Sequence, residues 1–373
     1  MDFVNESKVA AGWTMGFERD GRELIVVAIK ATFVIPHDGD EPRLADEQTK
    51  LTEADEFTAE PGLSAPRYES DYAHRKPYCD VIVNGSAYAP GGRPTHEVVV
   101  GVKVGSMVKG FNVTGNRVWR SGIVGVSASE PELFQVIPIS YDNAFGGIDV
   151  GSGDPQNVRT YRANPVGKGY SHHKKDLDGK PLPNTEEVRR PIANPSGAYQ
   201  PMSFGSIGRN WLPRAGFAGT YDDKWLENRA PFWPDDFDDR YFQATTPDQQ
   251  IAYPMGGEDV LLRNLTPDGH VHFKLPTMSM SVLFIPYRGR PQAIDAKIDT
   301  MLIQPDLGRI ALTWRAAYSL RRSCFDLMRV VAGKTAAEWY GRRRFGRKPY
   351  YRNLADLVKA RARARTSQPP WHA

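Results

Sequence analysis

The chain has 373 residues, of which 34 are Gly and 29 are Pro, well above the roughly 12% that these two types contribute to an average soluble protein. Gly and Pro are the poorest helix formers, so this excess argues against a helical bundle or a coiled coil. Disorder is also disfavoured, because 40% of the residues are hydrophobic and 11% are aromatic, whereas disordered chains are poor in both.

The formal net charge of +4 is unevenly distributed. Residues 338–373 carry ten basic and two acidic side chains, so this end has a charge of +8 and the rest of the chain a charge of −4. Two cysteines, Cys79 and Cys324, are too few for a disulfide framework, which fits a reducing compartment. Residues 1–8 lack a signal-peptide pattern and the longest apolar run, 24–29, is far too short to span a membrane. We therefore expect a soluble cytoplasmic protein without a membrane partner.

Residues 10–120 are predicted to form strands. Asp20 and Gly21 provide a hairpin turn between residues 13–17 and the Val- and Ile-rich residues 24–35. Further along, four valines alternate with other residues, which places them on one face of a strand. These valines are Val98, Val100, Val102 and Val104.

From residue 140 to residue 258 the periodicity fades, although aromatic residues remain frequent. A loop of this length without secondary structure is improbable in a compact domain, so we expect ordered but irregular chain. One short helix is predicted near residues 222–229. Residues 167–191 are predicted to be a mobile excursion, because they are rich in Lys and His and almost lack apolar side chains.

Strand patterns return in the last third of the chain. Two hairpins are predicted, one from residues 260–265 and 271–275 and one from residues 294–303 and 310–317. Helical patterning is restricted to three late segments, at residues 324–331, 336–342 and 354–365.

The sequence therefore predicts a mainly β fold of the β-rich α+β type. It consists of sandwich- or barrel-like sheets with long ordered loops and a few C-terminal helices. Residues 1–335 form the β-rich domain and residues 336–373 a basic helical tail. An alternative divides the first domain into two subdomains near residues 140–260.

Two groups of residues raise the alternative of an enzyme. His270 and His272 share one face of a predicted strand, as metal ligands do. His172 and His173 are further candidate ligands, but no other ligand stands at a recognisable spacing. Four carboxylates follow an aromatic stretch and suit a carbohydrate-active enzyme, although Asp is equally typical of turns, which we favour. These carboxylates are Asp235, Asp236, Asp238 and Asp239.

Other chemistry has weaker support. The sequence has no Gly-x-Ser-x-Gly nucleophile motif and no phosphate-binding Gly-rich loop, so we predict no catalytic residue, no metal and no cofactor. The basic tail suits phosphate neutralisation, but Arg361, Arg363 and Arg365 fall on different faces of a helix. Contact with solvent or with an acidic protein is favoured over nucleic acid.

Five stretches of the sequence stand out as motifs. They are SDYAHRKPYCDVIVNGSAYAP at 70–90, YDNAFGGID at 141–149, NPVGKGY at 164–170, residues 204–238 with FGSIGRNWLPRAG, GTYDDKW and RAPFWPDDFD, and GGEDVLLRNL at 256–265. In order and spacing, from near the N-terminus to about residue 320, the chain resembles a bacterial family first defined as a domain of unknown function. Members of that family are encoded beside type VI secretion effectors and their spike proteins.

The resemblance implies a non-catalytic role in a Gram-negative bacterium. It implies an effector chaperone or adaptor that binds a toxin effector carrying a PAAR-type tip domain, stabilises it and helps to load it onto the secretion spike. The implied partners are that effector, the spike protein and a small co-chaperone. Six residues of this chain that lie in or near these motifs are expected to hold the fold, since Asn and Asp suit unusual backbone turns. They are Asp80, Arg117, Phe145, Asn164, Asn184 and Asp222.

A protein that binds another protein needs aromatic and Arg anchors. The densest such set lies between residues 209 and 233, and for its tryptophans burial in the core is the alternative. The predicted partner-binding residues are Arg209, Trp211, Arg214, Trp225, Arg229 and Trp233.

Overall fold

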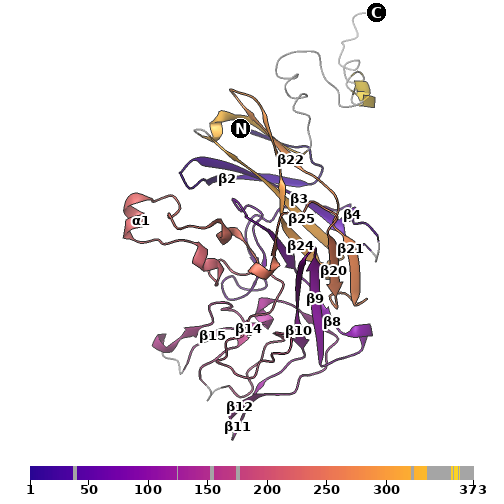
Figure 1. The fold of residues 1–373 in the computed structure, drawn as a ribbon, viewed down its shortest axis with the longest axis vertical. Helices are drawn as coiled ribbons and strands as arrows, with labels where there is room; N and C mark the ends of the chain where they lie inside the picture. The colour runs from indigo at the N-terminus through magenta and orange to yellow at the C-terminus, as the bar shows by residue number, and fades with distance from the viewer. Residues whose placement is uncertain are drawn as a thin grey trace, which may run out of the picture.

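The computed structural model describes residues 1–36, 40–123, 125–151, 155–173, 177–320 and 323–333, together with 354, 355, 357–359 and 361. About 40% of the chain is strand and 11% is helix, and the strands form a nearly closed, barrel-like arrangement (Figure 1). The predicted mainly β class is therefore confirmed. None of the described helices is both long and apolar enough to span a membrane.

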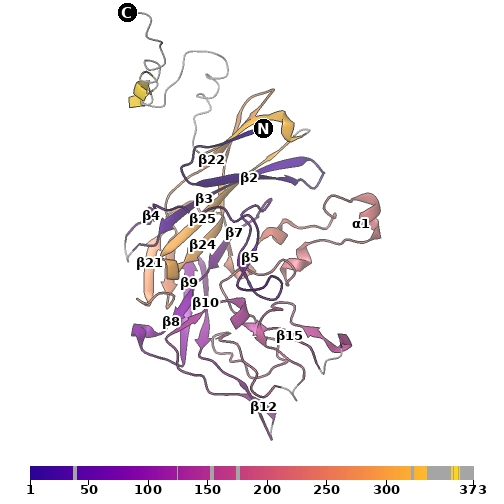
Figure 2. The ribbon, with the colours of Figure 1, turned by 180° about the vertical axis from the view of Figure 1, so that it is seen from behind.

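The largest sheet has seven strands, and its central strands lie at the middle of the molecule in both views (Figures 1 and 2). Its path is β19 (Gln250–Ile251), β7 (Cys79–Val83), β24 (Lys297–Gln304), β25 (Arg309–Ser319), β3 (Glu23–Val34) and β2 (Ala10–Phe17), with β4 (Arg43–Leu44) pairing with β3. Only β24 and β7 pair in parallel in this sheet. β2 forms one edge.

Two further sheets complete the barrel-like body. The five-stranded sheet has the order β18 (Thr185–Glu186), β10 (Met107–Thr114), β9 (Glu97–Val104), β20 (Asp259–Arg263) and β21 (His270–Lys274). The four-stranded sheet has the order β1 (Asp2–Asn5), β26 (Leu327–Ala332), β22 (Ser281–Pro286) and β23 (Gln292–Asp295).

One hydrophobic core joins the three sheets. It receives Ile25 and Val27 from β3, Phe284 from β22 and Val330 from β26. The four alternating valines of β9 also lie in this core, as their period of two predicts. Burial on this scale supplies the main driving force for folding, at about 25 cal/mol per Å² of apolar surface.

The predicted hairpins are confirmed. β2 and β3 pair in antiparallel register around the turn at Asp20 and Gly21, and β20 pairs with β21 around the turn at Gly269. The strand predicted over residues 294–303 is divided into β23 and β24, which belong to different sheets. β24 then pairs with β25 as predicted.

Residues 140–258 are mostly irregular yet well packed, as predicted. Short two-stranded ladders here and nearby are β5 (Glu56–Phe57) with β6 (Pro66–Tyr68), β8 (Ser86–Tyr88) with β13 (Val136–Pro138), β11 (Trp119–Gly122) with β12 (Gly125–Ala128), β14 (Phe145–Gly146) with β17 (Lys168–Gly169), and β15 (Ile148–Asp149) with β16 (Arg159–Thr160). The predicted short helix is α1 (Asp223–Asn228), and Asp222 caps it by accepting a 2.9 Å bond from the Trp225 N–H.

Two sequence-based predictions need correction. The described part of residues 167–191 is not an excursion, because Leu177 and Leu182 are buried in a second core around Trp119 and Phe145. The helix predicted over residues 324–331 is wrong beyond a short 3₁₀ helix at Cys324–Asp326, since residues 327–332 form β26, inserted between β1 and β22. Hydrogen bonding to strands on both sides outweighs the helical pattern of these residues.

The remaining helix predictions concern the tail. Residues 336–342 lie outside the described residues. Within residues 354–365, the described positions are helical.

Candidate functional site

A row of polar side chains crosses four strands of the seven-stranded sheet. Lys30 of β3 is opposite Thr313 of β25, Thr313 is opposite Thr300 of β24, and Thr300 is opposite Asp80 of β7. Residues directly opposite one another in a sheet point to the same face, so these four side chains share the face that lies away from the main core. The sheet therefore has an apolar face and a charged face.

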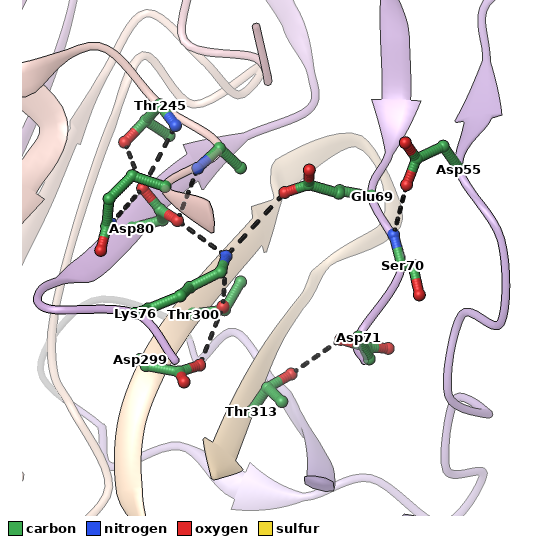
Figure 3. Close-up of polar contacts among 12 residues, drawn as sticks. Asp55, Glu69, Ser70, Asp71, Lys76, Asp80, Thr245, Asp299, Thr300 and Thr313 are labelled. Atoms are coloured by element: carbon green, nitrogen blue, oxygen red, sulfur yellow. Dashed lines mark hydrogen bonds and ion pairs between the residues drawn. The ribbon is translucent and has the colours of Figure 1, made fainter. Parts of the chain in front are cut away.

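A strap formed by residues 69–76 lies over this charged face (Figure 3). The Lys76 Nζ donates to Asp80 at 2.7 Å and to Thr300 at 3.1 Å. The carboxylate of Asp71 accepts from the Lys30 Nζ at 2.8 Å and from the Thr313 hydroxyl at 3.1 Å. The strap is thus held by ionic and hydrogen-bonded contacts with the sheet beneath it.

Asp80 is the most heavily bonded carboxylate of this face and is fully buried. Besides Lys76, it accepts from the Gln243 side chain at 2.9 Å, the Ala244 N–H at 2.9 Å, and the Thr245 N–H and hydroxyl at 3.2 and 2.6 Å. Residues 243–245 lie more than 160 positions after Asp80 in the sequence. This one carboxylate therefore links the irregular region of residues 140–258 to the seven-stranded sheet.

A register shift in β24 between Ile298 and Thr300 brings a second buried carboxylate onto the same face. Asp299 forms an ion pair with Arg315 of β25, and Arg315 also donates to the backbone carbonyl of Asp71. At the other end of the strap, Glu69 forms an ion pair with Arg214.

The network, which is buried except around Arg209 and Asp55, is balanced in charge. Its five cations are Lys30, Lys76, Arg209, Arg214 and Arg315, and its five carboxylates are Asp55, Glu69, Asp71, Asp80 and Asp299. The cavity at the Lys30 end of the network has a volume of about 30 Å³, which fits a water molecule. A larger pocket, of about 250 Å³, lies at the other end and is lined in part by Glu69 and Arg214. The ion pairs hold the strap and the irregular region together.

The two buried carboxylates beside Lys76 have pKa values shifted in opposite directions. Burial acts to raise the pKa of Asp80, but the Lys76 ammonium and the Ala244 N–H outweigh it and lower that pKa. Burial dominates for Asp299 and raises its pKa, although Arg315 and Lys76 act against it. The better-bonded carboxylate is the one that stays ionised most readily.

This difference predicts how stability depends on pH. Because the folded-state pKa of Asp80 is below the ordinary 3.8, its contribution is complete above that value and is lost as the pH falls further. The raised pKa of Asp299 acts in the opposite sense, since its contribution is present at low pH and lost as the pH rises through the folded-state pKa. We expect acidification from about pH 6 to about pH 3 to destabilise the wild type more than the Asp80→Asn variant. Urea unfolding at several pH values measures this, and equal losses would contradict it.

The other family-motif residues hold the second core and the chain around it. The Arg117 guanidinium donates to Glu186 at 2.9 Å, and the Asn164 amide donates to the carbonyls of Tyr141 and Phe145 at 2.8 and 3.1 Å. The Asn184 amide donates to the Thr114 carbonyl at 3.1 Å. All of these side chains are buried, which fits the structural role expected for them.

The residues of the enzyme alternative lie apart and are engaged locally. His272 contacts Asp259 at 3.0 Å on the outer face of the β20–β21 hairpin, and His270 at its end is exposed. His173 contacts Asp149 at 3.0 Å. Among the described residues, no group of three His, Cys, Asp or Glu side chains is placed to hold a metal ion.

The clustered aspartates form turns and ion pairs. The Asp236 carboxylate accepts from the N–H and hydroxyl of Thr220, Asp238 pairs with Arg240 at 2.7 Å, and Asp235 pairs with Arg229 at 3.0 Å. Asp239 begins a short 3₁₀ turn. The turn role favoured for this cluster matches these contacts.

The structure divides the predicted partner-binding residues into two groups. Trp211 and Arg214 are 3% and 2% exposed, so they face the interior and direct contact with a partner is not supported for them. Arg209 is partly exposed, but both its Nε and Nη2 atoms donate to the Asp55 carboxylate. These three residues belong to the buried network and its surroundings, which sequence spacing did not reveal.

Trp225, Arg229 and Trp233 lie elsewhere, on residues 219–234, which we term the α1 arm. Figure 1 shows this arm extending to one side of the sheets. The Trp225 indole donates to the Phe232 carbonyl at 2.9 Å and the Arg229 guanidinium to the Arg19 carbonyl at 2.8 Å. All three side chains are only partly buried.

Two apolar side chains of the arm that sequence reasoning missed are more exposed. Tyr221 is 53% exposed and Leu226 is 63% exposed, and the Tyr221 ring lies 4.8 Å from that of Trp225. At the base of the arm is a pocket of about 220 Å³, lined by Phe17, Trp233 and other aromatic side chains, with Arg19 and Arg75 beside them. Aromatic and Arg side chains are the types enriched where proteins bind one another.

Sequence reasoning also missed several residues of the network. Lys30, Asp299 and Arg315 interrupt otherwise apolar strands, and a charged residue within such a run was the available signal. Their partners were not evident, because they come from strands that are adjacent only in the folded sheet.

The chain is thus a β-rich protein with a charged strap on one face of its largest sheet and an aromatic arm. The family model described as an uncharacterized protein conserved in bacteria (DUF2169) matches residues 20–315, and the chain belongs to this family. No curated protein and no solved structure matches the chain.

Proposed function

We propose that this protein is a type VI secretion effector chaperone or adaptor. It binds a PAAR-type toxin effector in the cytoplasm, stabilises it and helps to load it onto the secretion spike, either directly or with a small co-chaperone. The proposed role is non-catalytic. Support comes from the five motifs, all of which lie within the family match at residues 20–315.

The observation that carries a protein-binding role is the surface of the α1 arm. Tyr221 and Leu226 present large apolar side chains to solvent, with Trp225 between them in sequence. Hot spots of protein interfaces are enriched in Trp, Tyr and Arg, and Arg229 lies in the same segment. The pocket at the base of the arm has room for one or two side chains of a client.

The charges of the buried network support the same view. The charges of Lys30, Lys76 and Arg315 are neutralised by internal ion pairs. The network gives the arm a rigid base, because Asp80 is bonded to residues 243–245, which follow the arm in the chain.

Co-expression with a neighbouring PAAR-type effector tests the proposal. We expect the two proteins to co-purify, and we expect the effector to be less soluble and less secreted in a strain that lacks this protein. An effector that stays soluble and is secreted normally without it would overturn the proposed function.

The variant Leu226→Glu tests the proposed surface. A carboxylate at an apolar contact has to be desolvated without a partner, so we expect the affinity for the effector to fall at least about tenfold. Isothermal titration calorimetry or a quantitative pull-down measures the change.

Val108→Glu is the matched control. Val108 is 69% exposed, like Leu226, but it lies on β10 of the five-stranded sheet, far from the arm in sequence. It is expected to bind the effector as the wild type does. If both variants bind normally, the arm is not the client-binding surface.

A further inference from the structure

Among the strands that the structure describes, β2 lies at an edge of its sheet and lacks the residues that usually protect an edge. It pairs with β3 on one side, and its eight residues, AAGWTMGF, include no charged residue and no Pro. Exposed edges normally carry such residues, because a bare edge is a template for pairing with another chain. This edge is therefore suited to receive a further strand.

The ladder with β3 determines which backbone groups point outward. The Glu18 N–H donates to the Arg22 carbonyl at 2.8 Å, and bonded pairs alternate along an antiparallel ladder. Gly16, Thr14 and Gly12 consequently bond to β3. Phe17, Met15 and Trp13 direct their N–H and carbonyl groups to the open edge.

The side chains of the outward residues form an apolar row on one face. Trp13 is opposite Val27 and Met15 is opposite Ile25, and both of these β3 residues lie in the main core. Trp13 and Met15 nevertheless remain 39% and 37% exposed, whereas Phe17, at 47%, packs edge-to-face on Phe232 of the α1 arm. At this edge the core face of the sheet is incompletely covered.

We propose that β2 pairs in antiparallel fashion with β2 of a second copy of this chain, with Thr14 on the two-fold axis. In this register Trp13 is opposite the second copy's Met15, and Ala11 is opposite its Phe17. Large side chains thus meet smaller or flexible ones, and each such pair exchanges outward backbone bonds. The two seven-stranded sheets become one continuous sheet across the axis.

The position of the His74 side chain leaves room for β2 to pair with a second copy. Its ring lies over Gly16 and interacts with the backbone of Met15. The Met15 carbonyl also accepts a long bond of 3.5 Å from the Thr14 hydroxyl, and a backbone N–H of the second copy can replace this bond. His74 and that N–H then use the two lone pairs of the carbonyl oxygen.

A cysteine on the axis gives the sharpest test. Thr14 faces its own copy across the edge as a non-hydrogen-bonded pair, with an expected Cα–Cα distance of about 4.5 Å, which is within the range of a disulfide. In a Cys324→Ser background, Thr14→Cys is expected to form a disulfide-linked dimer under mild oxidation. Val108→Cys, also in that background, is expected to remain uncrosslinked.

Light scattering on the unmodified full chain should give twice the mass of one chain. Thr14→Lys places two like charges directly opposite one another and should give monomers, with circular dichroism confirming that the variant is folded. Amide exchange at Trp13, Met15 and Phe17 should accelerate when the wild type is diluted. A monomeric wild type, a dimer that Thr14→Cys fails to crosslink, or an edge occupied by a strand of the effector in place of a second copy would overturn the proposal.

Discussion

Replacing Asp80 by Asn is expected to lower the free energy of unfolding by about 3–5 kcal/mol, because the variant leaves a buried Lys76 ammonium without its counterion. The new amide also directs N–H groups at donors, since Asp80 accepts from Gln243, Ala244 and Thr245. A loss of this size is a large part of the 5–15 kcal/mol that is typical of a folded domain. Urea unfolding followed by circular dichroism and by Trp fluorescence measures it.

The control for Asp80 is Asp20→Asn. Asp20 also pairs with a cation, Arg22 at 2.7 Å, but both side chains are exposed, so little change in stability is expected. A double-mutant cycle that adds Lys76→Met separates the ion pair from the remaining bonds, and we expect the second substitution to recover part of the loss. If Asp80→Asn and Asp20→Asn are equally mild, the buried network does not hold the fold.

Gly146→Ala is the second substitution with a large expected effect. Gly146 has a φ of 153°, and a Cβ at this position would lie 2.1 Å from the backbone carbonyl oxygen of Asn164. Since Asn164 is buried and bonded to the carbonyls of Tyr141 and Phe145, that carbonyl oxygen has little room to shift. We expect a destabilisation of at least about 4 kcal/mol, seen as a lower urea midpoint and a lower soluble yield.

Gly179→Ala separates the two causes of that loss. Gly179 also has a positive φ, 76°, but a Cβ there would meet no atom within 4 Å. Its expected loss is about 1–2 kcal/mol, from backbone strain alone. If the two alanine variants were equally stable, close contact with Asn164 would not explain why a glycine stands at residue 146 of the motif at 141–149.

Local pattern predicted much of the fold. The β2–β3 hairpin, the alternating valines of β9 and the β20–β21 hairpin depend on a turn and on neighbouring residues, all of which are visible in the sequence. β26 was mistaken for a helix because its residues, LMRVVA, suit either structure when taken alone. Its position between β1 and β22 brings together residues more than three hundred positions apart.

For the charged network, less could be predicted from the sequence than for the fold. The motif at residues 70–90 was recognised, and Asp80 was expected to hold the fold. The sequence does not predict the partners of Asp80 at residues 243–245, nor the polar row from Lys30 to Thr300. The local pattern of a strand does not indicate which other strands lie beside it in the sheet. Trp211 and Arg214 looked like surface anchors for the same reason.

The sequence by itself determined the β-rich class, the hairpins and the family, because turns, alternation and ordered motifs are local properties. The tertiary structure alone decided which charges are buried together, which aromatic side chains stay at the surface and which strand is left at an edge. Burial and pairing depend on segments distant along the chain, and their energies arise only when those segments meet. The aromatic arm and the bare edge of β2 are therefore findings of the folded molecule.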